Sequence, residues 1–306
     1  MTPSRVLIFG RGQLGSLYRA WFESKGCMVD APQGDIRDEA FVSGAISAAQ
    51  PDLIVNTVGK TSIDWCEMNR TEAFEVNTLG SDVVAKAAEE RGIYLLHISS
   101  GCVQESLTAE DVHAEEDAPH PLCYYSWTKV WAENLLSERA RRGSLKVLVL
   151  RPRQLLSAMV SPRNALIKML TYSKFIDTPN SCTIVEDLLE VSWQLIQKDA
   201  TGLYNVVNPG ITTPYRIAEA LKRHLKPEMA FTKISKDELN RMTLAKRVDC
   251  VLSGAKLEKE GIRLRPIEER LAEILSELKR NLESEEAGAI LRRTEAETVE
   301  KLNLMK

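Results

Sequence analysis

A tyrosine and a lysine four residues apart, Tyr125 and Lys129, form the pair in this sequence best suited to proton transfer. In a helix, this spacing puts both side chains on one face. A tyrosine ordinarily loses its proton near pH ~10, and a fixed cation beside it favours the phenolate and lowers its pKa. We therefore expect Tyr125 to exchange protons near neutral pH, although the same spacing is also typical of an ordinary amphipathic helix.

The N-terminal residues predict a strand, a glycine-rich turn and a helix in direct succession. An apolar run at residues 5–9 is followed by three glycines and then by apolar residues at helical spacing. In this arrangement the first glycine permits a tight turn, the second lets a pyrophosphate approach the backbone, and the third allows the helix to pack on the strand. The sequence therefore predicts a dinucleotide-binding turn made of Gly10, Gly12, Gln13, Leu14 and Gly15.

Asp30 lies twenty residues after Gly10, at the end of the next apolar run. A carboxylate at this distance could accept hydrogen bonds from the adenosine ribose, which favours NADH, or could be an ordinary turn residue. Arg11 beside the glycine turn could instead hold a 2′-phosphate, so NADPH remains open. A second polar turn adds Asp35 and Ile36, which we expect to meet the adenine edge.

Apolar runs alternate with amphipathic helices through the first half of the chain. The runs cover residues 5–9, 27–29, 53–56, 94–99 and 146–151, and a further run covers residues 203–207. This alternation predicts an α/β fold of the Rossmann-like, doubly wound type, in which right-handed crossovers place helices on both faces of a parallel sheet. Ligands in such sheets bind beyond the carboxyl ends of the strands, where Gly10, Thr57, Gly59 and Ser100 fall.

The pattern after Pro152 is less regular and predicts a smaller, discontinuous substrate-binding domain. Residues 162–164 open a helix that carries Lys168, residues 178–181 form a turn, and residues 185–196 form a helix. We expect a dinucleotide-binding domain of residues 1–157 and 183–207, a substrate-binding domain of residues 158–182 and 208–280, and a charged helical tail of residues 281–306. The tail, interrupted mainly at Gly288, could pack on the body, mediate a homodimer or fray.

Composition and charge are those of a globular enzyme. Of 306 residues, 44% are hydrophobic, which is enough for a large core. The formal net charge is −3 and the basic residues are scattered, so no nucleic-acid surface is expected. We expect no signal peptide, no membrane span and a cytoplasmic location. The six cysteines form no Cys-x-x-Cys pair and no metal-ligand spacing with the four histidines, so we expect no metal and mostly reduced, buried thiols.

Several motifs occur in an order that resembles a known family. The glycine turn, the Asn77 helix, Ser100 and the Tyr125-x-x-x-Lys129 pair resemble the extended short-chain dehydrogenase/reductase superfamily. Five further motifs match a narrower group more closely: plant-type UDP-4-keto-6-deoxyglucose 3,5-epimerase/4-reductase (rhamnose synthase) and the related dTDP-4-dehydrorhamnose reductases. These motifs are Asp64-Trp65-Cys66-Glu67, Ser100-Gly101-Cys102, Pro162-Arg163-Asn164, Pro179-Asn180-Ser181 and Asn208-Pro209-Gly210. The resemblance covers about residues 5–275 and is weakest at residues 103–105, where those enzymes tend to carry an aromatic and an acidic stretch.

This resemblance implies an NADH- or NADPH-dependent reduction of the C4 ketone of a nucleotide-linked 4-keto-6-deoxyhexose. Tyr125 would protonate the developing alkoxide, and Ser100 would hold the carbonyl oxygen. Lys129 would lower the pKa of Tyr125 and bond the nicotinamide ribose, with Asn77 also among the cofactor-binding residues. Ser100 could instead be only a strand-end cap.

Cys102 could extend this chemistry, because it lies two positions after Ser100 and would share its face if the strand stays extended. In the resembling epimerases a cysteine at this place is an acid or base for inversion at C3 and C5. Lys168 matches the position of the partner acid, and a nearby cation would also lower the pKa of the thiol. The alternative is a buried structural Cys102 and a surface Lys168.

The remaining expected site residues would bind the substrate. Charged and amide side chains suit its diphosphate and base, and an aromatic residue suits the floor of a sugar pocket, although solvated turn residues are an alternative for some. These residues are Thr61, Asp64, Trp65, Arg163, Asn164, Asn180 and Arg247. Two other functions stay open: a non-catalytic nucleotide-binding regulatory subunit, and another nucleotide-sugar epimerase or dehydratase on the same scaffold. A dehydratase normally needs an acidic pair where Gly101 and Cys102 stand.

Overall fold

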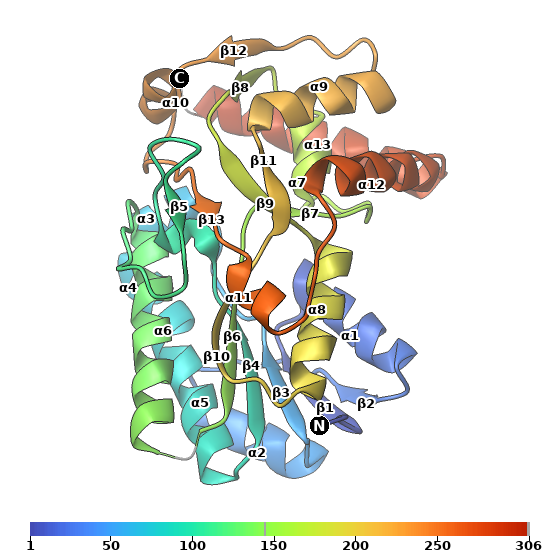
Figure 1. The fold of residues 1–306 in the computed structure, drawn as a ribbon. Helices are drawn as coiled ribbons and strands as arrows, with labels where there is room; N and C mark the ends of the chain where they lie inside the picture. The colour runs from blue at the N-terminus through green and yellow to red at the C-terminus, as the bar shows by residue number, and fades with distance from the viewer. Residues whose placement is uncertain (144, 305–306) are drawn as a thin grey trace.

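A six-stranded parallel sheet forms the centre of the computed structural model, which describes residues 1–143 and 145–304. Its strand order is β10-β6-β4-β3-β1-β2 (Figure 1). The strands are β1 (Arg5–Phe9), β2 (Met28–Asp30), β3 (Leu53–Asn56), β4 (Tyr94–Ile98), β6 (Val147–Pro152) and β10 (Gly202–Val206). All six lie within one residue of the apolar runs in the sequence, so the Rossmann-like α/β fold is confirmed.

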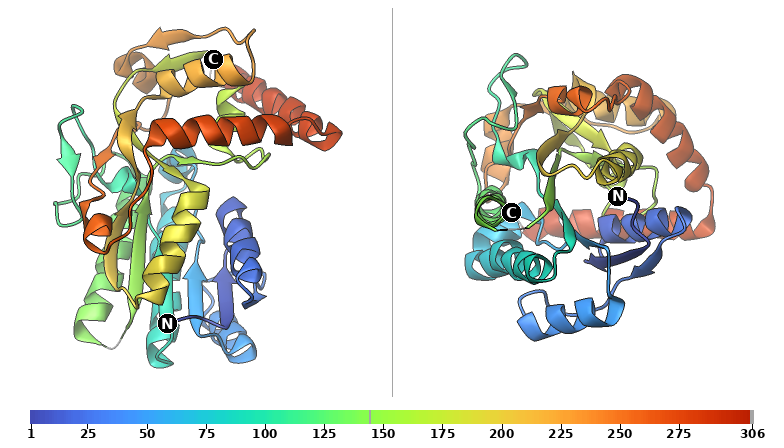
Figure 2. Two further views of the ribbon diagram at one scale, coloured as in Figure 1. Left: turned by 45° about the vertical axis from the view of Figure 1, so that its right-hand side comes forward. Right: turned by 60° about the horizontal axis from the view of Figure 1, so that its bottom comes forward.

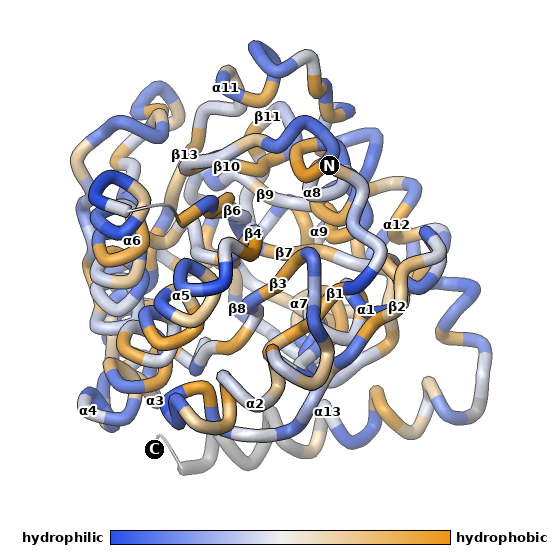
Figure 3. The backbone as a smooth tube through the Cα atoms, turned by 90° about the horizontal axis from the view of Figure 1, so that it is seen from below, coloured by the Kyte–Doolittle hydropathy of each residue, from blue (hydrophilic) through white to orange (hydrophobic). Residues whose placement is uncertain are grey.

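Helices cover both faces of this sheet because successive strand residues point to opposite sides. Val6 and Ile8 of β1 pack on one face with helices α1 (Gln13–Ser24) and α8 (Val185–Gln197). Leu7 and Phe9 pack on the other face, with α2 (Glu39–Ala49), α5 (Gly80–Glu90) and α6 (Tyr124–Arg142). Figure 3 shows hydrophobic residues concentrated in the central strands. The double burial explains why these strands read as continuous apolar runs.

The small sheets lie toward the end of the molecule where α9 and α12 are found (Figure 2). One holds β11 (Asn208–Thr212), β9 (Asn180–Ile184) and β7 (Leu155–Leu156); the others pair β12 (Thr232–Ile234) with β8 (Lys174–Ile176) and β13 (Val251–Leu252) with β5 (Val112–His113). The helices here are α7 (Ala165–Met169), α9 (Pro214–His224), α10 (Lys236–Met242), α12 (Ile267–Asn281) and α13 (Glu285–Leu304), whereas α11 (Ala255–Lys259) packs against β10 of the large sheet. A separate core unites the β7-β9-β11 sheet with α9 and α12.

The structure corrects two local predictions. Asn180 and Ser181 do not form a turn but begin strand β9, which pairs with both β7 and β11. The tail is interrupted at residues 282–284 rather than at Gly288, which lies inside α13. In both places the pairing or packing of neighbouring elements overrides the local tendency of the residue to form a turn. The two-domain division stays a prediction.

Two further properties of the described residues bear on the expectations. All six cysteines are buried and free of disulfides, as expected. Within residues 1–143 and 145–304, no helix combines the length and the apolar character that crossing a bilayer requires.

Candidate active site

The glycine turn between β1 and α1 forms a cradle whose close packing leaves no room for a side chain at Gly10 or Gly15. Gly10 has a φ of +110°, and a Cβ there would lie 2.3 Å from Thr57 Oγ1. A Cβ at Gly15 would lie 2.0 Å from the Gly10 carbonyl oxygen. Gly12 caps α1 without a side-chain hydrogen bond, so the first backbone amides of the helix are available to bind a ligand. This geometry suits a pyrophosphate.

The loop after β3 forms the opposite wall of the cradle. Thr57 Oγ1 donates to the Phe9 carbonyl at 3.1 Å, and a Cβ at Gly59 would lie 3.6 Å from Lys129 Nζ. Asn77 lies behind this loop: its Oδ1 accepts from Lys60 N at 2.7 Å, and its Nδ2 donates to Lys60 O at 3.0 Å. Asn77 belongs to a π-helical turn, η1 (Glu75–Leu79), a geometry frequent at functional sites. Asn77 therefore holds the loop that lines the cavity.

Ser100, Tyr125 and Lys129 line one cavity of about 870 Å³ together with the glycine turn. Ser100 follows β4, accepts a hydrogen bond from Cys102 N at 3.2 Å and donates one to the phenol oxygen of Tyr125. Lys129, one helical turn after Tyr125 on α6, donates to the Ile98 carbonyl at 3.1 Å. The structure thus brings together the hydroxyl, phenol and ammonium groups singled out in the sequence.

Burial has the largest influence on the pKa values of Tyr125 and Lys129. It raises the pKa of Tyr125 above its usual value, an effect that the hydrogen bond from Ser100 only partly offsets. It also lowers the pKa of Lys129 to about 8, against the opposing influence of Glu133. The expected lowering of the Tyr125 pKa is therefore wrong: desolvation of the phenolate outweighs the neighbouring cation.

A buried ion pair supports the trio from behind. Arg151 binds Glu133 through two hydrogen bonds, Nε to Oε1 at 2.9 Å and Nη2 to Oε2 at 2.6 Å. Ser99 Oγ donates to the same carboxylate at 2.5 Å, so one acid ties β6 and the end of β4 to α6. Sequence reasoning missed this pair. Its signal was the carboxylate four residues after Lys129, on the same helix face, and an arginine ending a buried strand.

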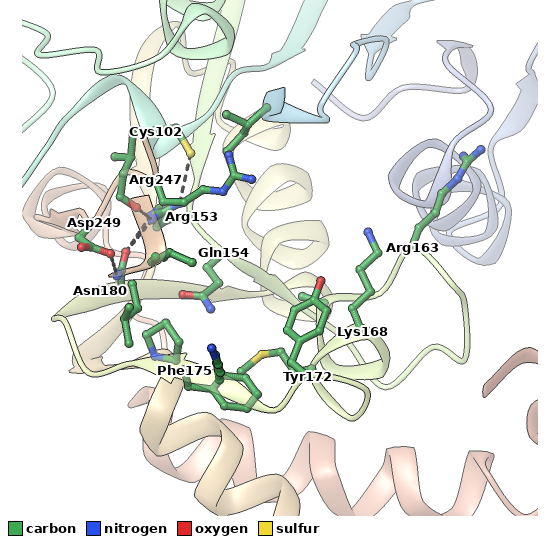
Figure 4. A pocket seen from close by; sticks show the side chains of 18 residues that line it. Cys102, Arg153, Gln154, Arg163, Lys168, Tyr172, Phe175, Asn180, Arg247 and Asp249 are labelled. Carbon is green, nitrogen blue, oxygen red and sulfur yellow. Dashed lines mark hydrogen bonds between the residues drawn. The ribbon is translucent and has the colours of Figure 1, made fainter. Parts of the chain in front are cut away.

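Cys102 lies where the large cavity joins a second one of about 380 Å³. It sits in a 3₁₀ turn, η2 (Gly101–Val103), not in an extended strand. The expected extended strand at Cys102 is therefore wrong, although Cys102 and Ser100 both line the large cavity. Figure 4 shows Cys102 on one side of the smaller cavity and Lys168 on the other.

Arg153, which sequence reasoning missed, is the cation that touches Cys102. Its Nη1 donates to Cys102 Sγ at 3.1 Å, and its Nε and Nη2 donate to Asn180 Oδ1 at 3.1 and 2.6 Å (Figure 4). The adjacent Gln154 has a φ of 41°, unusual for a residue with a side chain, and also lines both cavities. The cation expected beside the thiol was Lys168, so this expectation is corrected.

Five of the seven expected substrate-binding residues line the two cavities. Thr61 and Trp65 line the larger one, Asn180 and Arg247 the smaller one, and Arg163 lines both. Arg163 also reaches the glycine turn, since a Cβ at Gly12 would lie 3.4 Å from its Nη1.

Two further contacts shape this region. Asp64 is held by Arg247, with Nη1 to Oδ1 at 2.9 Å and Nη2 to Oδ2 at 2.5 Å. Lys60 Nζ lies 4.7 Å from the centre of a Trp65 ring. Within the part of the chain that the structure describes, no group of three or more His, Cys, Asp or Glu side chains is placed to hold a metal ion.

Seven expected site residues line neither of these two cavities: Gly10, Asp30, Asp35, Ile36, Asp64, Asn77 and Asn164. Asn164 caps α7: its Oδ1 accepts from Leu166 N, and its Nδ2 donates to two backbone carbonyls, so it is a structural residue and not a substrate contact. Asp35 is engaged by Arg37, and Ile36 is buried against Gly80 in the core. Asp30 is exposed at the end of β2.

A family model and curated relatives match most of this chain. The RmlD substrate binding domain family matches residues 4–280. A bifunctional dTDP-4-dehydrorhamnose 3,5-epimerase/dTDP-4-dehydrorhamnose reductase of Arabidopsis thaliana is 29% identical over 89% of this chain and 92% of the relative. A trifunctional UDP-glucose 4,6-dehydratase/UDP-4-keto-6-deoxy-D-glucose 3,5-epimerase/UDP-4-keto-L-rhamnose-reductase of the same plant is 30% identical over 89% of this chain, which spans only 42% of that relative.

Solved structures of other proteins have the same fold. The L780 UDP-rhamnose synthase of Acanthamoeba polyphaga mimivirus superposes with a TM-score of 0.82 at 26% identity, covering 89% of this chain and 98% of the other. A dTDP-4-dehydrorhamnose reductase of Bacillus anthracis, in complex with NADP, gives a TM-score of 0.79 at 22% identity, over 91% and 99% of the two chains. The chain therefore belongs to the RmlD substrate binding domain family, as the order of its motifs indicated.

Proposed function

We propose that this chain uses NADH or NADPH to reduce the C4 ketone of a nucleotide-linked 4-keto-6-deoxyhexose. The observation that carries the proposal is the meeting of Ser100, Tyr125 and Lys129 in one cavity with the glycine turn. The rhamnose-forming names of the relatives in Arabidopsis and mimivirus support the choice of sugar.

The glycine turn fits a dinucleotide, because Gly10 and Gly15 let it pack tightly against the loop after β3 while the N-terminus of α1 lines the cavity. When bound, the reduced cofactor supplies the hydride. Thr57, Gly59 and Lys129 line the same cavity and would hold the ribose end. The B. anthracis relative in complex with NADP supports NADPH, while the exposed Asp30 keeps NADH as the alternative.

Tyr125 would donate its proton to the alkoxide that develops at C4. Its raised pKa keeps the phenol protonated at neutral pH, as a proton donor requires. Lys129, with a pKa lowered to about 8, still carries its charge at pH 7 and stabilises the phenolate once the proton has left. Ser100 would hold the ketone oxygen by a hydrogen bond.

We further propose that the chain inverts C3 and C5 in the same cavity before the reduction. The ketone acidifies the protons on both carbons. Cys102 as a thiolate would take such a proton, forming S–H and an enolate whose negative charge rests on the C4 oxygen. Lys168, on the other side of the cavity in Figure 4, would return a proton to the opposite face of the carbon.

The test is incubation with 4-keto-6-deoxyhexoses carried on UDP, dTDP or GDP, with NADH and with NADPH, reading product stereochemistry by NMR. We expect turnover with at least one pair and inversion at C3 and C5. A product changed only at C4 would leave a simple reductase. No turnover with any pair would favour the regulatory-subunit alternative.

Epimerisation has its own measurement, which needs no reductant. In deuterated water without cofactor, the wild-type protein should incorporate deuterium at C3 and C5 of the keto sugar. If no label enters, the epimerase half of the proposal fails while the reductase half stands.

A further inference from the structure

Arg153 makes an unusual set of contacts for an arginine that lines an interior cavity. Its side chain donates four hydrogen bonds: two to Asn180 Oδ1, one to the Val248 carbonyl at 2.5 Å and one to Cys102 Sγ at 3.1 Å. Amide and carbonyl oxygens are neutral. Among these acceptors only the sulfur of Cys102 can carry a negative charge.

Asp249 and Glu105 are the carboxylates whose charges act on Arg153, and both form ion pairs with Lys236. Asp249 accepts from Asn180 Nδ2 at 2.8 Å and forms an ion pair with Lys236, so it meets Arg153 only through the intervening amide. A guanidinium withdrawn from bulk water without an opposing charge is costly, and the cost falls when an adjacent group ionises. This balance favours the thiolate form of Cys102, since arginine keeps its charge at every pH at which the protein is folded.

We propose that Arg153 is a positioning residue that holds Cys102 as a thiolate, aimed at the carbon beside the sugar ketone. The proposal deepens the proposed epimerisation and rests on it for its purpose, but the ion pair itself needs no substrate. The proton that leaves Cys102 goes to solvent. The Sγ lone pair then accepts the hydrogen bond from Arg153 Nη1 and is the base that receives the sugar proton.

Other titratable groups around Cys102 do not supply the same effect. Burial raises the pKa of Tyr125, of Cys123 and of Cys250, the last to about 12, so all three are neutral at pH 7. Lys129 also favours the thiolate, but it loses its charge near pH 8. Lys168 lines the same cavity from the far side. Arg153 is thus the permanent cation within hydrogen-bonding distance of the sulfur.

The test measures the pH dependence of Cys102 alkylation by iodoacetamide in the full-length protein, without sugar or cofactor. Mass spectrometry of the Cys102 peptide separates it from the other five cysteines. We expect the wild-type midpoint to lie below the ~8.5 of a free thiol. In Arg153→Met it should rise by at least ~1 unit, with alkylation at pH 7 about 10-fold slower, whereas Arg153→Lys should restore most of the reactivity.

Lys168→Met is the matched control, because it removes another cation that lines this cavity. It should leave the midpoint at the wild-type value. An unchanged midpoint in Arg153→Met, or a shift in Lys168→Met alone, overturns the proposal. Should Arg153→Met fail to fold, the thiolate absorbance near 240 nm of wild type minus Cys102→Ser decides instead: its absence at pH 7 refutes the ion pair.

The outcomes separate this proposal from the proposed function. Deuterium exchange into the sugar with an ordinary thiol titration refutes only the role of Arg153. A low thiol midpoint without exchange refutes the epimerisation and leaves the Arg153–Cys102 pair standing.

Discussion

The two halves of the joined cavity are built in different ways. The tyrosine half (Ser100, Tyr125, Lys129 and the glycine turn) stands on the ends of β1, β3 and β4 and on the first turns of α1 and α6. The cysteine half consists of Cys102, Arg153, Lys168, Asn180 and Arg247. It is held together by hydrogen bonds between side chains distant in sequence: Arg153 binds Asn180, 27 residues away, and Arg247 binds the neighbouring Asp64, 183 residues away.

This difference separates two ways of fixing a reactive group. In the tyrosine half, regular elements and a buried ion pair fix each side chain, so its geometry follows from the sheet. In the cysteine half, pairs of polar side chains bring short segments together. Changes in the cysteine half should therefore alter chemistry with little loss of stability, whereas changes beneath the tyrosine half should do both.

The largest effect should come from a substitution that removes the reduction but leaves the epimerisation. Tyr125→Phe removes the proton donor and should lower kcat for reduction by about 10²- to 10⁴-fold. It should leave deuterium exchange into the keto sugar within a few-fold of wild type, because exchange depends on Cys102. Stopped-flow oxidation of NADPH and NMR of the labelled sugar measure the two rates on the same preparation.

Cys102→Ser is the converse control for this prediction. It should abolish exchange while a sugar already inverted at C3 and C5 is still reduced. If Tyr125→Phe abolishes exchange as strongly as reduction, the tyrosine half and the cysteine half do not act independently, and the difference between them described above is contradicted.

The next effect concerns stability. Arg151 and Glu133 are buried, with side-chain exposures of 4% and 10%, whereas Arg247 and Asp64 are 25% and 31% exposed. Glu133→Gln leaves a buried guanidinium without its anion and should lower the free energy of unfolding by about 3–5 kcal/mol. Asp64→Asn should cost no more than about 1 kcal/mol. Urea denaturation of both variants measures the contrast, and equal losses would contradict it.

The difference between regular elements in the tyrosine half and long-range side-chain contacts in the cysteine half also explains which residues the sequence could predict. Gly10, Gly12 and Gly15, and the pair Tyr125 and Lys129, are local patterns whose spacing has one structural meaning in a helix or a strand–turn–helix unit. The six strands followed from continuous apolar runs for the same reason. These patterns lead directly to the tyrosine half.

The cysteine half was less predictable because its contacts are not local. Nothing near Arg153 in the sequence indicates that its guanidinium meets Cys102, and Asn164 looked like a ligand although it caps a short helix. Lys129 shows a further limit. Its spacing from Tyr125 was read correctly, but the direction of the tyrosine pKa depends on burial, which only the folded structure supplies.

A third prediction uses the pKa of Lys129, which burial lowers to about 8. The ammonium is charged below this value, so kcat/KM for the reduced cofactor should fall about tenfold per pH unit as the pH rises beyond it. Stability should change in the opposite direction: an unfolded lysine binds its proton up to pH ~10.4, so the unfolding free energy should rise between the two values.

Glu133 sharpens this test, because its charge raises the pKa of Lys129. In Glu133→Gln the alkaline fall in kcat/KM should begin at a lower pH than in wild type. A profile that stays flat to pH ~9.5 in wild type would show that the charge of Lys129 is not needed in the tyrosine half.

The smallest effect should come from Arg163, the side chain that bridges the halves. Its guanidinium lies close to Gly12 and lines both cavities, so we expect it to bind the cofactor pyrophosphate rather than the diphosphate of the substrate. Arg163→Met should raise the Kd for NADPH about 5- to 10-fold, measured by fluorescence titration without sugar, since one exposed charge-assisted bond contributes about 1 kcal/mol. Arg247→Met, which removes an arginine of the cysteine half only, should leave that Kd unchanged. If Arg163→Met instead raises KM for the sugar nucleotide and leaves the Kd for NADPH unchanged, Arg163 belongs to the substrate, and the boundary between the halves lies nearer the glycine turn.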